Sequence, residues 1–160
     1  MVALQGVVLA AEEPLPKSHE SRVRKMYEDS KKAFAEVPEY KLSQLKNDNK
    51  EDYVLVDTRA EEEQNVSVIP GAISVKEFEK NMEVYKSKIV VAYCTIGFRS
   101  GLFARKLIKK NIKAYNLEGS ILGWVHSGGE LRDKQGLLTN KVHVFGSSYN
   151  LLPPNYEGVW

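Results

Sequence analysis

The chain has 160 residues, 42% of them hydrophobic and 28% charged, which indicates one ordinary globular domain and argues against a disordered or fibrous protein. A formal net charge of +2 gives no reason to expect nucleic acid as a partner, and no run of 18 apolar residues could span a membrane. The single cysteine, Cys94, excludes an internal disulfide.

The first part of the chain, residues 1–36, is predicted to be an extension ahead of the main domain. Residues 3–14 look like the tail of a secretory signal, because a short apolar run ends in small residues, but a basic segment before it is missing. An ordinary extension and a cytoplasmic location are therefore expected; if residues 1–11 are a signal remnant, the location would be periplasmic or secreted. Apolar residues near helical spacing then predict an amphipathic helix over 21–37.

Strand and helix patterns alternate through the middle of the chain. After a short extended piece and a helical turn capped by Ser43, four apolar runs are typical of buried strands, each followed by a helical pattern. This alternation predicts an α/β fold with a doubly wound, mostly parallel sheet flanked by helices. The expected strands cover 52–59, 68–75, 89–94 and 113–119, and the expected helices 60–65, 76–88, 100–111 and 121–129.

The last part of the chain, residues 132–160, is predicted to be a second extension. It contains one strand-like alternation from Val142 to Phe145 and a tail rich in aromatic residues and proline. Apolar side chains left in water would create a sticky patch, so the tail is expected to pack back on the domain. The side chains concerned are Tyr149, Leu151, Leu152, Tyr156 and Trp160.

Cys94 opens a short loop between a predicted strand and a predicted helix. Such a loop directs unpaired backbone N–H groups to one point, and the helix end together with Arg99 would favour a thiolate. Gly97 can adopt a positive φ, so the N–H groups can turn inward, and Ser100 could cap the helix or donate to the sulfur. Thr95, Ile96 and Phe98 add no charge. The alternative is an inert cysteine at the end of a core strand, but the combination of these residues favours a reactive thiol.

The sequence "VVAYCTIGFRSG" (90–101) resembles the active-site segment of the rhodanese-type sulfurtransferases, in which a cysteine opens a six-residue loop. "LVDTR" (55–59), "VIPGAISV" (68–75) and "YNLEGSILGWVHSGGEL" (115–131) resemble other segments of that family, in the family's order. The resemblance implies a rhodanese-like domain over 37–131. Val68 and Ser120 depart from the family, which usually has histidine and glycine there, and the neutral loop residues put thiosulfate in doubt as the natural donor.

The resemblance implies a double displacement in which Cys94 takes a sulfane sulfur from a small anionic donor such as thiosulfate, polysulfide or a persulfide. The resulting persulfide would pass its sulfur to cyanide or to a thiol, including a protein thiol. The loop residues Thr95, Ile96, Gly97, Phe98, Arg99 and Ser100 would bind the anion. No metal and no organic cofactor is expected.

Two alternatives remain open. A phosphatase or arsenate reductase on the same fold would also use a cysteine loop, but the related phosphatases have five residues between cysteine and arginine, and this chain has four. A binding module without turnover usually lacks the cysteine, which is present here. An intact-mass experiment would separate these functions. Arg99→Ala is expected to weaken the use of anionic donors while folding is kept.

Several other residues are interpreted as structural. Asp57 and Arg59 end a strand on the side of Cys94 and could support catalysis, but an ion pair or cap is the expected role. Trp124 is expected in the core rather than at a substrate. His126 and His143 belong to no recognisable arrangement of cysteine and histidine, so both are taken as structural or surface residues.

Overall fold

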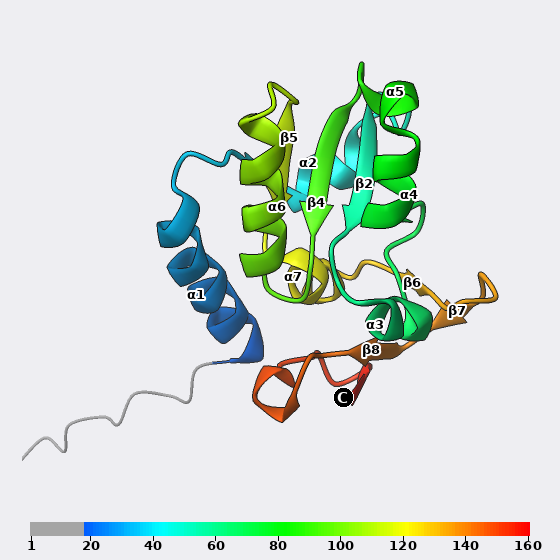
Figure 1. Cartoon of the computed structure of the whole chain (residues 1–160). Helices are drawn as coiled ribbons and strands as arrows, with labels where there is room; N and C mark the ends of the chain where they lie inside the picture. Colours follow the sequence, from blue (N-terminus) through cyan, green and yellow to red (C-terminus); the bar gives the residue numbers. More distant parts are fainter. Residues whose placement is uncertain (1–17) are drawn as a thin grey trace, which may run out of the picture.

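The structure is a computed structural model that describes residues 18–160 (Figure 1). The interpretation of residues 3–14 as a signal tail lies outside the described part. No helix within residues 18–160 is long and apolar enough to cross a membrane.

A five-stranded sheet forms the centre of the fold. Its order is β1-β5-β4-β2-β3, and every neighbouring pair is parallel. The predicted strands all form, although the second shrinks to two residues. The strands are β1 (Glu39–Tyr40), β2 (Tyr53–Asp57), β3 (Ile73–Ser74), β4 (Ile89–Tyr93) and β5 (Ala114–Leu117). Because all five are parallel, their carboxyl ends meet at one edge, toward α3 (Glu61–Val66), α7 (Ser120–His126) and β8 (Lys141–His143) (Figure 1).

Helices cover both faces of this sheet, as the doubly wound prediction requires. One face packs against α4 (Val75–Lys80), α6 (Phe98–Ile108) and the 3-10 turn η1 (Lys32–Phe34). The other face packs against α1 (His19–Lys31), α2 (Leu42–Asn47), α7 and the C-terminal segment. From Tyr53 to Val56 the side chains of β2 alternate between the two layers, so this stretch is buried on both sides and is apolar.

Several details of the helices differ from the sequence predictions. The predicted helix over 76–88 divides at Asn81 into α4 and α5 (Met82–Tyr85). The helix after the cysteine loop starts at Phe98 rather than at Ser100. Ser43 lies inside α2 and does not cap it; the helix begins after Lys41, whose N–H donates to Gln44 Oε1.

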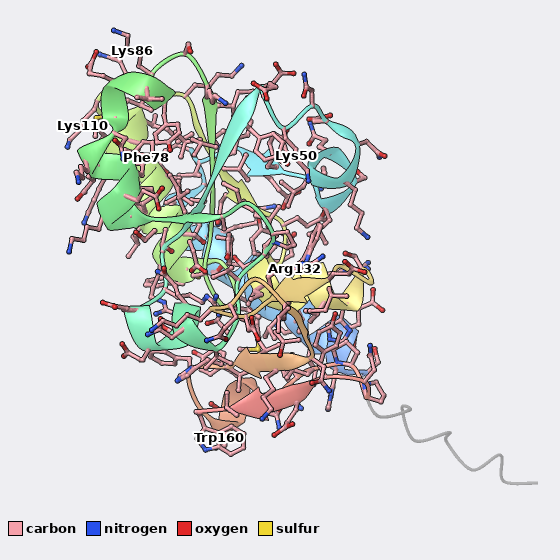
Figure 2. The ribbon with its side chains drawn as sticks, turned by 90° about the vertical axis from the view of Figure 1, so that its right-hand side faces the viewer. Lys50, Phe78, Lys86, Lys110, Arg132 and Trp160 are labelled. Carbon is pink, nitrogen blue, oxygen red and sulfur yellow. The ribbon has the colours of Figure 1, made fainter. Side chains whose placement is uncertain are left out.

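The C-terminal segment folds under the carboxyl edge of the sheet (Figures 1 and 2). Leu151 and Leu152 are buried in the same cluster as the sheet residues, and Tyr149 and Tyr156 pack against it. Trp160 differs from the expectation: its side chain is 64% exposed and projects from the molecule (Figure 2). The segment contains β6 (Leu131–Arg132), β7 (Leu138–Thr139), β8, the 3-10 turn η2 (Ser147–Tyr149) and β9 (Glu157–Val159).

Candidate active site

Cys94 directly follows β4 at the carboxyl edge of the sheet, and α6 begins four residues later. The backbone N–H of Gly97 donates to Cys94 Sγ at 3.1 Å, and the Ser100 hydroxyl lies 3.5 Å from the same sulfur. Cys94 is only 2% exposed, but it lines a small pocket at the protein surface. The thiol is therefore recessed rather than sealed in the hydrophobic interior.

The surroundings of Cys94 favour its ionised form. Burial by itself raises the pKa of a thiol, because a thiolate loses hydration. Here the hydroxyl and backbone N–H of Ser100, the N–H of Gly97 and the charge of Arg99 outweigh burial, and the pKa of Cys94 lies below that of an ordinary cysteine. Hydrogen bonds and charge lower the pKa, as they do at other reactive cysteines.

The backbone of the loop is held by the start of α7. Ser120 Oγ accepts a hydrogen bond from the Cys94 N–H at 3.1 Å, and the N–H groups of Ile121 and Leu122 donate to the carbonyls of Cys94 and Thr95. Ser120 has a φ of 52°, a value that glycine adopts at lower cost. This backbone conformation is a physical reason for a glycine at the corresponding position in related proteins, and in this chain the hydroxyl supplies an extra contact.

Gly97 is required by both conformation and space. Its φ is 118°, and a Cβ added there would lie 2.6 Å from Cδ2 of Tyr27 on α1. The side-chain amide of Asn116 donates to the Gly97 carbonyl at 2.8 Å, and Asn116 Oδ1 accepts from the Ser100 hydroxyl. The N-terminal helix therefore packs directly behind the cysteine loop.

Arg99 reaches across to α3 and forms a bidentate ion pair with Glu63. Arg99 Nη1 and Nη2 lie 2.6 and 2.8 Å from the two carboxylate oxygens, and Nη2 also donates to Thr95 Oγ1. Burial raises the pKa of Glu63, but the bonds from Arg99 and from the N–H of Ala60 outweigh it and the pKa is lowered. Arg99 is thus a partly neutralised cation at the mouth of the site.

The pocket in front of Cys94 has a volume of about 150 Å³. One wall is the loop itself, with Ile96 and Phe98, and the other comes from Phe145 and Tyr149 of the C-terminal segment. The rings of Phe145 and Tyr149 meet edge to face at 5.6 Å. The surface that lines the pocket is therefore mainly apolar.

Asp57 and Arg59 form a buried bidentate pair, with Arg59 Nη2 2.6 Å from Asp57 Oδ2. Arg59 also donates to the carbonyl of Ser67, and the Tyr93 hydroxyl donates to Asp57 Oδ2 at 2.6 Å. Neither residue lines the Cys94 pocket. Their contacts fix β2, β4 and the segment before β3 to one another.

The residues interpreted as structural do not line the Cys94 pocket, although His143 bonds a residue that does. Trp124 is partly buried against the core and donates to the carbonyl of Glu130, and a ring nitrogen of His126 bonds the Leu151 carbonyl. His143 Nδ1 accepts from the Phe145 N–H and lies 4.0 Å from Glu63. It therefore supports the backbone of Phe145 in the C-terminal wall.

Sequence reasoning missed Glu63, Asn116, Ser120 and Phe145. Glu63 sat in a run of three glutamates with nothing to distinguish it, and Phe145 belongs to a segment expected only to cover the core. Asn116 carried a usable signal, because a polar residue inside an otherwise apolar strand needs a partner when it is buried.

A comparison with known families matches residues 40–127, more than half of the chain, to the rhodanese-like domain. The chain belongs to the rhodanese-like domain family. Membership supports sulfur transfer as the general chemistry of the site and agrees with the resemblance seen in the sequence.

Curated relatives of this rhodanese-like domain include larger proteins. A tRNA sulfurtransferase of Desulfurococcus amylolyticus is 40% identical over 70 residues, which is 44% of this chain. A tRNA uridine(34) hydroxylase of Acholeplasma laidlawii is 31% identical over 102 residues, 58% of this chain. The matches cover 14% and 31% of those two proteins, so the chain spans less than a third of either.

Solved structures share the fold of the rhodanese-like domain. A thiosulfate sulfurtransferase from Pseudomonas aeruginosa has a TM-score of 0.57 and 21% identity over 74% of this chain and 24% of its own. A rhodanese-related protein from Thermoplasma volcanium has a TM-score of 0.51 and 21% identity over 59% of this chain and 96% of its own. At this identity the likeness shows the fold alone.

Proposed function

We propose that this protein is a sulfurtransferase that carries a sulfane sulfur as a persulfide on Cys94. The observation that supports this most directly is the setting of the sulfur: it accepts a hydrogen bond from the Gly97 N–H, lies beside the Ser100 hydroxyl and opens to a pocket. These groups lower the pKa of Cys94, and a thiolate is the nucleophile that the first step needs.

In the first step the Cys94 thiolate attacks the outer sulfur of the donor. A new bond forms between Cys94 Sγ and that sulfur. The bond between that sulfur and the rest of the donor breaks, and its electron pair goes to the departing group. The departing group is sulfite from thiosulfate, a shortened polysulfide from a polysulfide, or a thiolate from an organic persulfide. The backbone N–H groups of Gly97 and Ser100 stabilise the negative charge that the persulfide retains.

In the second step an acceptor nucleophile, cyanide or a thiolate, attacks the outer sulfur of the persulfide. The bond between the two sulfurs breaks, and the electron pair returns to Cys94 as a thiolate. The site regains its starting state without any external oxidant or reductant.

The pairing of Arg99 with Glu63 bears on the choice of donor. An unpaired guanidinium would attract a dianion such as thiosulfate strongly, whereas a guanidinium in a bidentate ion pair has less charge to offer. We therefore propose organic persulfides, which carry less charge at the reacting end, ahead of thiosulfate as donors. The tRNA substrates named for two relatives belong to those proteins, and the proposal for this chain is limited to the sulfur step that its own residues support.

The decisive experiment is intact mass spectrometry of the full chain after incubation with polysulfide. A gain of about 32 Da, one sulfur atom, that disappears with cyanide and does not form in Cys94→Ser supports the proposal. Absence of the adduct with every sulfane donor would exclude it. Hydrolysis of phosphate esters without an adduct would instead favour the phosphatase, and neither activity would favour a binding module.

A further inference from the structure

The dimensions of the Cys94 pocket limit what enters it. The pocket has a volume of about 150 Å³, and Cys94 itself is 2% exposed. Cyanide fits entirely inside such a space. A larger thiol can place its sulfur and the adjoining carbon next to Cys94, but the rest of the molecule must lie at the mouth of the pocket.

The mouth of the pocket is aromatic. Phe98 from the loop and Phe145 from the C-terminal segment both line the pocket, and they are 47% and 58% exposed. Within residues 18–160 no lysine lines the pocket, and the one arginine there, Arg99, is paired with Glu63. A molecule resting at the mouth therefore meets exposed aromatic carbon and little free charge.

Phe145 is held at the mouth in an unfavourable backbone conformation. Its φ is 68°, which is rare for a bulky residue with a Cβ and costs free energy. Its N–H donates to His143 Nδ1, and its ring lies over the Arg99 guanidinium at 5.1 Å. Strain of this kind persists where the surrounding structure fixes it and is often associated with function.

We propose that Phe145 and Phe98 form the co-substrate subsite of this protein and that the subsite selects organic thiols with an apolar or aromatic group over thiols with an anionic group. The proposal rests on the sulfurtransferase function and makes Phe145 a residue that determines specificity. The apolar group lies against the two rings while the thiol sulfur enters the pocket.

The step is the transfer from the loaded enzyme to that thiol. The acceptor thiolate attacks the outer sulfur of the Cys94 persulfide, and the bond between the outer sulfur and Cys94 Sγ breaks. The products are an organic persulfide and the Cys94 thiolate, so one sulfur atom moves and no electrons are gained or lost overall.

The test measures discharge of the persulfide-loaded full chain by three acceptors. Benzyl mercaptan is the apolar thiol, 2-mercaptoethanesulfonate is the anionic thiol, and cyanide is small enough not to need the subsite. Each thiol rate constant, corrected for thiolate concentration, is divided by the cyanide rate constant of the same variant. In the wild type we expect the benzyl mercaptan ratio to exceed that of mercaptoethanesulfonate by at least about tenfold, which corresponds to about 1.4 kcal/mol.

Phe145→Asn removes the ring but suits the positive φ, since asparagine tolerates this region better than other residues. We expect the benzyl mercaptan ratio to fall about tenfold in this variant and to be kept in Phe145→Tyr. Leu137→Asn is the matched control, because Leu137 is 64% exposed on the turn between β6 and β7 and does not line the pocket. The benzyl mercaptan ratio of this variant should equal that of the wild type.

The outcomes separate the two proposals. A persulfide that forms normally, together with a ratio that Phe145→Asn leaves unchanged or a wild-type preference for the anionic thiol, overturns the subsite and leaves sulfur transfer intact. Failure of the wild type to form any persulfide overturns the proposed function, and the subsite with it.

Discussion

Arg99 at the mouth of the site is held by Glu63, a residue 36 positions earlier in the chain, through two hydrogen bonds of 2.6 and 2.8 Å. The pair joins the start of α6 to α3 at the carboxyl edge of the sheet. Because the Glu63 side chain is only 3% exposed, its charge depends on this partner.

The first prediction concerns the stability of that pair. Arg99→Ala leaves a buried carboxylate without its cation, and we expect a loss of about 2 kcal/mol in the free energy of unfolding, less than for a fully buried pair because the Arg99 side chain is about a third exposed. Urea denaturation of Arg99→Ala and of the double variant Arg99→Ala with Glu63→Gln checks it: the second change should recover part of the loss, and additive losses would contradict the pairing.

The second prediction concerns the ionisation of Cys94. The Ser100 hydroxyl can donate to Asn116 Oδ1 or to Cys94 Sγ, and donation to the sulfur favours the thiolate, so Ser100→Ala should raise the pKa of Cys94 relative to the wild type. As the pH is lowered, the variant should lose its thiolate first. The measurement is the pH dependence of alkylation by iodoacetamide, with Ser43→Ala, an exposed serine on α2, as the control. Identical midpoints in wild type and Ser100→Ala would show that Ser100 does not stabilise the thiolate.

The third prediction separates conformation from crowding at Gly97. Gly136 has a φ of 80°, and no atom of residues 18–160 lies within 4 Å of an added Cβ, so Gly136→Ala measures the conformational cost alone, about 1 kcal/mol. Gly97→Ala adds a contact with Tyr27 and should cost about 3 kcal/mol. Thermal and urea unfolding of the two variants give the comparison. Equal losses would mean that α1 yields to the new methyl group.

The fourth prediction tests whether the Asp57 network is structural. The Tyr93 hydroxyl donates to Asp57 and accepts from the Ile69 N–H at 3.1 Å. In Tyr93→Phe the Asp57 carboxylate and the Ile69 N–H each lose this hydrogen bond inside the core. We expect a loss of about 2 kcal/mol in stability. Persulfide formation per folded molecule should be kept, as mass spectrometry below the unfolding transition can show. A variant of normal stability that no longer forms the persulfide would instead place this network in the chemistry.

The strands and the cysteine loop could be predicted from the sequence because each has a local signal. The apolar runs of β2 and β4 are continuous because both faces of the sheet are covered, and Gly97 marks the one loop position with a strongly positive φ. Trp160 could not be placed, because the argument that apolar side chains avoid water applies to a tail as a whole and not to its last residue.

The environment of the site was less predictable, because it depends on contacts between distant segments. Nothing local in the sequence distinguishes Glu63 from its two neighbours, and only the folded α3 turns it toward Arg99. Phe145 reaches the pocket through β8, which pairs in parallel with β9 at the end of the chain. Sequence periodicity predicts a strand there but not the surface that it approaches.

The two walls of the Cys94 pocket are anchored differently. The main chain of the cysteine loop is bonded to the first turn of α7 at Cys94 and at Thr95, so this wall has little freedom to retreat. In the opposite wall the backbone turns at Phe145, which has a positive φ, and this wall is attached to the strand pair β8 and β9. Any widening for a bulky co-substrate must therefore come from the C-terminal side, and a change that stiffens that side would slow the exchange of large molecules before it slowed the exchange of cyanide.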